Sequence, residues 1–87
     1  MDYKEYINAN KLLDLRSKKG IRQQDLADKL GMCVTDRISH WEKGTAIPSI
    51  INLFRLCAVH EVLPHELYPE LFEKIVSETH GKQNIPI

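Results

Sequence analysis

The stretch Ile38-Ser39-His40-Trp41-Glu42-Lys43-Gly44 decides the interpretation of this chain, because its spacing is typical of an amphipathic helix. Ile38 and Trp41 stand three positions apart, so both face the same side of a helix, with Val34 one turn earlier. Gly44 is a usual residue just beyond a helix end. We therefore expect a helix over about residues 35–43. Its outward polar face comprises Asp36, Ser39, His40 and Lys43.

One longer helix is expected before this stretch, near the start of the chain. Ile7, Leu12 and Leu15 form an apolar stripe at helical spacing, and Asp2 can cap the start. Gly20 follows two lysines, a usual helix ending. We expect a single continuous helix up to these lysines.

A short helix is expected next, over about residues 23–30. Leu26 and Leu30 lie on one face of it, and Gly31 stands just beyond the last apolar position. Arg22 occupies the position where Ser, Thr, Asp or Asn is preferred. This departure costs about 1 kcal/mol if nothing else compensates for the missing cap.

Three more helices follow the central stretch. Ser49 can cap a fourth helix with a broad apolar face, which we expect to be the best-buried element. Pro64 suits the first turn of a fifth helix, and Pro69 stops or redirects the chain. A sixth, amphipathic helix follows, and the tail from Gly81 is expected to be loose. The apolar faces comprise Ile50, Leu53, Phe54, Leu56 and Cys57 in the fourth helix and Leu71, Phe72, Ile75 and Val76 in the sixth.

Length and composition indicate one ordinary globular domain. A chain of 87 residues with 43% hydrophobic and 28% charged side chains has room for one compact core. No alternating pattern requires a strand, so the fold class is all-α. We expect residues 1–68 to form the domain, and residues 69–87 to pack back on it, to provide a dimer surface or to be flexible.

The chain is expected to be a cytoplasmic protein. No apolar run approaches the roughly 18 residues of a spanning helix, and the first residues lack the pattern of a secretory signal. Cys33 and Cys57 are too few for a disulfide framework, so we interpret both as reduced thiols.

Charge is polarised along the chain although the formal net charge is zero. Residues 16–45 hold seven basic and four acidic side chains, whereas residues 61–87 hold two basic and five acidic ones. The central part is locally basic, as a nucleic-acid partner requires.

Short motifs follow one another in a specific order between Leu12 and Tyr68. They are Leu15-Arg16, Gly20-Ile21, Gln23, Asp25-Leu26-Ala27, Leu30-Gly31, Ile38-Ser39, Trp41-Glu42-Lys43-Gly44, Pro48-Ser49 and Asn52-Leu53. Together they resemble the Cro/repressor-type (XRE-like) helix-turn-helix family. The resemblance implies a five-helix, lambda-repressor-like bundle whose third helix enters the major groove while the second lies across it. It also implies a structural ion pair between Arg16 and Glu42.

The turn before the third helix departs from the family pattern. Six residues separate Gly31 from Ile38, where five are usual. The extra residue either lengthens the turn or starts the helix half a turn early, and we count back from Ile38. On that count, the resemblance assigns base contacts to Thr35, Asp36, Arg37 and His40.

Arg37 is the informative member of this set, because a small residue is usual at its position in the family. An arginine there can hydrogen-bond guanine O6 and N7, worth about 1–3 kcal/mol of discrimination. It can equally pair with Asp36 or with a phosphate.

Contacts to the DNA backbone are expected around these base-reading positions. Arg22 places a positive charge where a phosphate should approach the amino end of the second helix. Gln23 matches the family's backbone-contacting glutamine. The full set of expected backbone contacts is Arg22, Gln23, Ser39, Lys43, Thr45, Lys18 and Lys19.

Other features of the sequence favour structural roles. The spacing of Trp41 from Ile38 favours core packing. Cys57 and His60, with His65 nearby, lack a second cysteine pair and do not make a zinc site. Cys33 has no group placed to orient a catalytic base. We expect no enzyme activity, no metal and no cofactor.

The sequence thus predicts a sequence-specific transcriptional regulator of double-stranded DNA. We expect a repressor that acts as a homodimer on a palindromic site. A phage or mobile-element regulator, an antitoxin and a restriction-modification controller all fit, with a toxin or the transcription machinery as further partners. The alternative is an interaction module that keeps the fold and docks a protein through its acidic part, Glu61 to Glu78.

Overall fold

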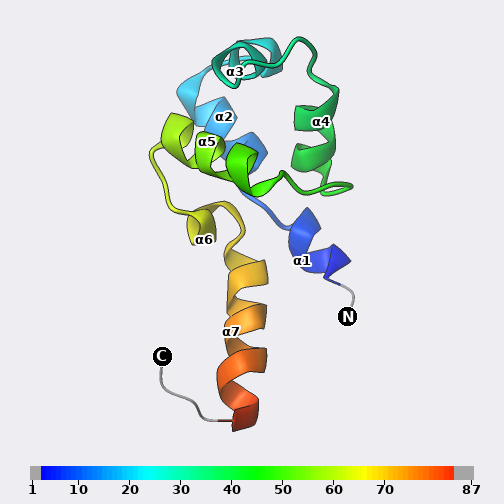
Figure 1. The fold of residues 1–87 in the computed structure, drawn as a ribbon, viewed down its shortest axis with the longest axis vertical. Coiled ribbons are helices and arrows are strands. Elements are labelled where there is room, and N and C mark those ends of the chain that lie inside the picture. Colours follow the sequence, from blue (N-terminus) through cyan, green and yellow to red (C-terminus); the bar gives the residue numbers. More distant parts are fainter. Residues whose placement is uncertain (1–2, 84–87) are drawn as a thin grey trace.

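The computed structural model describes residues 3–83, and all regular structure in that range is helical (Figure 1). The predicted all-α fold class is confirmed. The helices are α1 (Lys4–Asn8), α2 (Leu12–Lys19), α3 (Gln23–Lys29), α4 (Asp36–Lys43), α5 (Ile50–His60), α6 (Pro64–Leu67) and α7 (Pro69–Gln83).

Five of these helices, α2 to α6, surround one small core. The largest fully buried side chains are Leu26 of α3, Ile38 of α4, Leu56 of α5 and Leu67 of α6. Leu12 of α2 is also buried. Neither α1 nor the part of α7 up to residue 80 has a fully buried residue, and the last turns of α7 project beyond the other helices (Figure 1).

The single helix expected at the start of the chain is wrong, because Asn10 divides it into α1 and α2. The Asn10 amide nitrogen donates to the carbonyl oxygens of Ile7, at 2.9 Å, and Trp41, at 3.2 Å. Its side-chain oxygen accepts from the backbone nitrogen of Leu12 at 3.0 Å. One side chain thus ends α1, supports the start of α2 and binds the end of α4. Asp2, the expected cap, lies outside the described residues.

Most of the expected helix ends occur at the expected residues. Gly20, Gly31 and Gly44 all have positive φ angles. The Ser49 hydroxyl accepts from the backbone nitrogen of Asn52 at the start of α5. Pro64 is in the first turn of α6. Local sequence therefore predicted the ends of these helices well.

The burial expected for α5 is wrong. Leu56 and His60 are the buried residues of this helix, whereas Ile50, Ile51 and Phe54 are exposed. The reason is that α5 lies at the surface of the bundle, so one side of it contacts the core while its first turns carry apolar side chains into solvent.

Helix α7 is longer than expected. It begins at Pro69, directly after Tyr68 redirects the chain, and continues through Gly81 to Gln83. The expected loose tail is therefore helical in its first three residues. Helix α7 packs on α1, since the Tyr3 hydroxyl donates to the Glu78 carboxylate at 2.7 Å and the Lys74 ammonium lies 5.8 Å from the Tyr6 ring centroid.

Candidate nucleic-acid interface

Helices α3 and α4 are held together by buried apolar side chains. Leu26 and Ala27 of α3, with Leu30 just after it, belong to the same core as Ile38 and Trp41 of α4. The inward side of α4 is therefore fully used in packing, which leaves its other side for a partner.

The turn between these helices absorbs the extra residue. Helix α4 begins at Asp36, with Thr35 at its N-cap position, so the turn is lengthened and the helix does not start half a turn early. Val34 is 57% exposed. Our expectation that it faces inward is wrong, because it lies in the turn and not on the inward stripe of the helix.

The outward side of α4 presents a row of exposed polar side chains. Asp36, Arg37, His40 and Lys43 are exposed, whereas Thr35 and Ser39 are half-buried. Among residues 3–83, no hydrogen bond or ion pair engages the Arg37 guanidinium, so the pairing with Asp36 that we considered does not form. Arg37 therefore stands on the exposed side of α4 with all its donors available.

A hydrogen-bonded network fixes α4 against α2 and α3. Arg16 donates to Glu42 through Nε at 2.6 Å and through Nη2 at 3.1 Å, and its Nη1 donates to the Ile21 carbonyl. The Gln23 amide nitrogen donates to Glu42 Oε1 at 2.9 Å. Hydrogen bonding to Glu42 raises the pKa of Arg16 above its ordinary value. Gln23, expected at the DNA backbone, uses one of its two amide N–H donors in this network, so the other remains for a phosphate.

Arg22 lies at the amino end of α3, where its missing cap is compensated by Asp25. The Asp25 carboxylate accepts from the Arg22 backbone nitrogen at 2.8 Å, which satisfies one of the free donors at the helix start. The Arg22 guanidinium pairs with the same carboxylate at 3.1 Å and is largely exposed. Hydrogen bonds from Arg22 lower the pKa of Asp25. The guanidinium thus stands at the helix start with one carboxylate partner.

Lys18 and Lys19 are exposed at the carboxyl end of α2. Lys19 lines a hollow of about 380 Å³ together with Ile21, Lys29 and Val59. No residue of α4 lines this hollow, so the structure does not bring Lys19 into the row on α4.

His40 and Thr45 contact each other at the carboxyl end of α4. The His40 ring nitrogen Nδ1 lies 2.9 Å from the Thr45 hydroxyl oxygen. The same hydroxyl donates to the His40 carbonyl oxygen at 3.3 Å. The pair is exposed. Thr45, expected at the DNA backbone, therefore holds the imidazole ring of His40, for which we expected a base contact.

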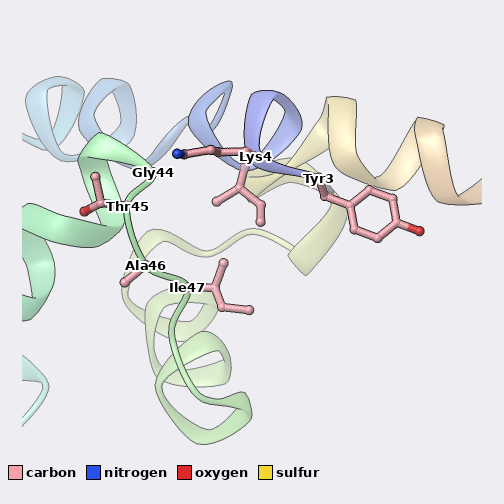
Figure 2. A pocket seen from close by; sticks show the side chains of 7 residues that line it. Tyr3, Lys4, Gly44, Thr45, Ala46 and Ile47 are labelled. Atoms are coloured by element: carbon pink, nitrogen blue, oxygen red, sulfur yellow. The ribbon is translucent and has the colours of Figure 1, made fainter. Parts of the chain in front are cut away.

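Helix α1 adds side chains that the sequence analysis missed. A hollow of about 480 Å³ lies between α1 and residues 44–47, and Figure 2 shows Lys4 extending toward Gly44 and Thr45 there. A second hollow, of about 460 Å³, is lined by Lys4 and Glu5 of α1 and by Lys43. No sequence signal could place α1 here, because its position depends on the break at Asn10.

The comparison with protein families agrees with this geometry. Residues 12–67, which hold α2 to α6, match the family model described as helix-turn-helix. The chain belongs to the XRE-type helix-turn-helix family. Helices α3 and α4 lie within the matched residues, while α1 and α7 lie wholly outside them. A search of curated proteins found no match.

Two further findings concern the described part of this helix-turn-helix protein. In residues 3–83, no three His, Cys, Asp or Glu side chains gather as a metal site would require. Within the same range, no helix combines the length and apolar character needed to cross a membrane.

Proposed function

We propose that the protein is a sequence-specific regulator that inserts α4 into the major groove of double-stranded DNA. The observation that carries the proposal is the exposed row on α4, in which the Arg37 guanidinium has no intramolecular partner within residues 3–83. An exposed arginine that is not paired within its own chain keeps its bidentate donors for a guanine edge.

The rigidity of α4 supports this proposal. Ile38 and Trp41 bury the inward side of the helix, and Glu42 binds both Arg16 and Gln23. A base-reading helix must hold its side chains within hydrogen-bond reach of the base edges, and buried anchors on the opposite side achieve this. In this proposal Thr35, Asp36, Arg37 and His40 read bases.

Basic and neutral polar side chains on α2, α3 and α4, and Thr45 just after α4, bind the sugar-phosphate backbone in this proposal. Arg22 is placed for this role at the amino end of α3, where the helix dipole also favours an anion. Such contacts add affinity without sequence information. The proposed set is Arg22, Gln23, Ser39, Lys43, Thr45, Lys18 and Lys19.

The proposed regulator is a cytoplasmic repressor that binds a palindromic operator as a homodimer. Two copies of α4 would enter the major groove at half-sites about one helical turn apart. The exposed row on α4 suits a phage regulator, an antitoxin and a restriction-modification controller alike.

Selection of duplexes from a random library tests the proposal directly. We expect one palindromic sequence to be enriched, and binding to it to weaken steeply as salt concentration rises, because each phosphate contact releases counterions. An absence of enrichment, or binding that does not respond to salt, contradicts the proposal.

Matched substitutions then test the role of α4. Arg37→Ala should weaken binding to the selected duplex by roughly 5-fold to 150-fold, whereas Arg55→Ala changes an exposed arginine on α5 and should leave affinity unchanged. His40→Ala is compared with His80→Ala on α7 in the same way. If Arg37→Ala and Arg55→Ala change the affinity for the duplex equally, α4 is not part of the DNA interface.

A further inference from the structure

The carboxyl end of α4 lies beside a lysine from a distant part of the sequence. Lys4 of α1 lines two hollows there, one of about 480 Å³ and one of about 460 Å³, and Gly44 and Thr45 line both of them as well. Figure 2 shows the Lys4 side chain extending toward these two residues. Lys43, the last residue of α4, also lines the second hollow. Two exposed lysines from separate helices therefore border one hollow.

This hollow continues the exposed row on α4. Lys43 belongs to the row, and Thr45, which borders the hollow, contacts His40 of the row through its hydroxyl group. A helix that lies in the major groove has a sugar-phosphate strand on either side, so side chains at its end come close to phosphates. Lys4 therefore stands next to side chains for which we propose DNA contacts.

The carboxyl end of a helix is an unfavourable place for a phosphate unless cations surround it. The last carbonyl groups of a helix carry partial negative charge, which repels an anion. The backbone nitrogens of Gly44 and Thr45 donate to carbonyl oxygens of α4, at 3.1 and 3.0 Å, so they are not available to an anion. A phosphate at this end of α4 must therefore be held by side-chain cations.

The balance of charge in the second hollow is positive. Lys4 and Lys43 outnumber Glu5, the acidic side chain that lines it among residues 3–83. In the first hollow, Lys4 is the only charged side chain within the described range. A phosphate near the two lysines gains more attraction than repulsion, and loss of the Glu5 charge should increase this gain.

Helix α1 is held in place from two sides, so the fold sets the position of Lys4. Gly44 has no side chain and lies against the backbone of Asn8 in α1. Just before the helix, the Tyr3 hydroxyl donates to the Glu78 carboxylate of α7. A cation that is positioned before binding loses less conformational freedom when it meets its anion.

We propose that Lys4 and Lys43 together bind one phosphate group of the DNA strand that passes the carboxyl end of α4. This inference rests on the proposed function, to which it adds α1 as a further element of the DNA interface. Helix α1 lies outside the residues that match the family model, so the segment before the matched domain adds this contact. A phosphate contact carries no sequence information, so Lys4 raises the affinity for every duplex alike.

Salt titration of binding to the selected duplex tests this proposal. Each phosphate contact accounts for about threefold of the affinity that is lost between about 50 and about 200 mM salt. Lys4→Gln should therefore weaken binding and make that loss about threefold smaller, with unchanged base preference. Lys4→Arg keeps the charge and should behave as the original protein. Lys11→Gln is the matched control, because Lys11 is also exposed and lines neither hollow.

Neutral methylphosphonate groups then locate the contact on the DNA. We replace the phosphates of the selected duplex one at a time and expect one position at which the original protein loses affinity. This loss should be smaller in Lys4→Gln and in Lys43→Gln, and absent in the double variant. Glu5→Gln should bind every duplex more tightly, because it removes the acidic side chain from the hollow.

Three outcomes overturn the proposal. They are a Lys4→Gln protein with the salt dependence of the original, an equal change caused by Lys11→Gln, and a scan in which no phosphate depends on Lys4. Failure of the proposed function gives a different result, because no duplex is then selected and both proposals fall. A selected duplex that Lys4→Gln binds as the original protein does overturns the contact of α1 alone and leaves the proposed role of α4 intact.

Discussion

Gly44 at the end of α4 lies directly against the backbone of Asn8 in α1. A Cβ atom built on Gly44 would fall 2.9 Å from the Asn8 backbone nitrogen and closer still to its Cα. Gly44 therefore meets two requirements at once: its φ of 78° ends the helix, and its missing side chain lets α1 approach. This contact joins a helix outside the family-matched residues to the end of α4.

Substitution of three glycines separates these two requirements. Gly20→Ala and Gly31→Ala change residues with positive φ and open space around them, so each should cost about 1–2 kcal/mol from backbone strain alone. Gly44→Ala should cost clearly more, because it also pushes against Asn8. Chemical denaturation measures all three. Equal costs for the three variants would mean that α1 does not pack against Gly44 in solution.

Leaving the Glu42 carboxylate without its partner Arg16 should destabilise the fold. It is 6% exposed and accepts from Arg16 and Gln23. Arg16→Met should destabilise the fold by about 3–5 kcal/mol, because it strands a buried charge. The double variant Arg16→Met/Glu42→Leu should recover most of this loss. A double variant that is no more stable than Arg16→Met would show that the loss of stability does not come from the unpaired charge of Glu42.

Thr45 should influence base preference through His40. Thr45→Val removes the hydroxyl that holds His40 Nδ1, so discrimination at the base pair under His40 should fall several-fold. Thr45→Ser keeps the hydroxyl and should restore it. Binding to duplexes that vary one base pair at a time gives the readout. Equal weakening on every duplex, with unchanged base preference, would show that Thr45 acts through its backbone contact alone and not through His40.

Stability should fall in mildly acidic solution because of His60. Burial lowers the pKa of His60 below 6.5, and Lys19 lowers it further, while Glu42 acts in the opposite direction. The unfolded chain therefore binds a proton more readily than the folded one. The free energy of unfolding is therefore unaffected by His60 above pH 6.5. It falls as the pH drops from 6.5 toward the pKa of His60 in the folded protein.

Removal of this imidazole tests the assignment. His60→Leu should flatten the decline in unfolding free energy below pH 6.5, whereas His80→Gln, which changes a half-buried imidazole on α7, should retain it. Denaturation curves across the mildly acidic range provide the measurement. The assignment is wrong if His60→Leu declines as steeply as the original protein.

Tyr68 carries a buried hydroxyl that no group in residues 3–83 binds. Burial raises the pKa of Tyr68 to about 12. Because a buried polar group without a hydrogen bond costs about 1–3 kcal/mol, Tyr68→Phe should raise the unfolding free energy. A loss of stability in this variant would reveal a partner for the hydroxyl in solution.

The sequence by itself determined the class and the local elements. Apolar spacing and end signals are local, so Ile38 and Trp41 as anchors of α4, Ser49 as the cap of α5, and Gly44 as the end of α4 could all be predicted. The order of motifs identified the family in the same way. Each of these inferences depends on residues within one or two helical turns.

The tertiary structure decided everything that depends on segments meeting across the chain. Asn10 breaks the first helix because the Trp41 carbonyl comes alongside it, and Gln23 and Thr45 are engaged by neighbours that their own spacing does not reveal. The exposed side of α5 arises because the bundle covers only one of its faces. The spacing of apolar residues along the sequence predicts which face of a helix is apolar. Whether another segment covers that face follows only from how the helices pack.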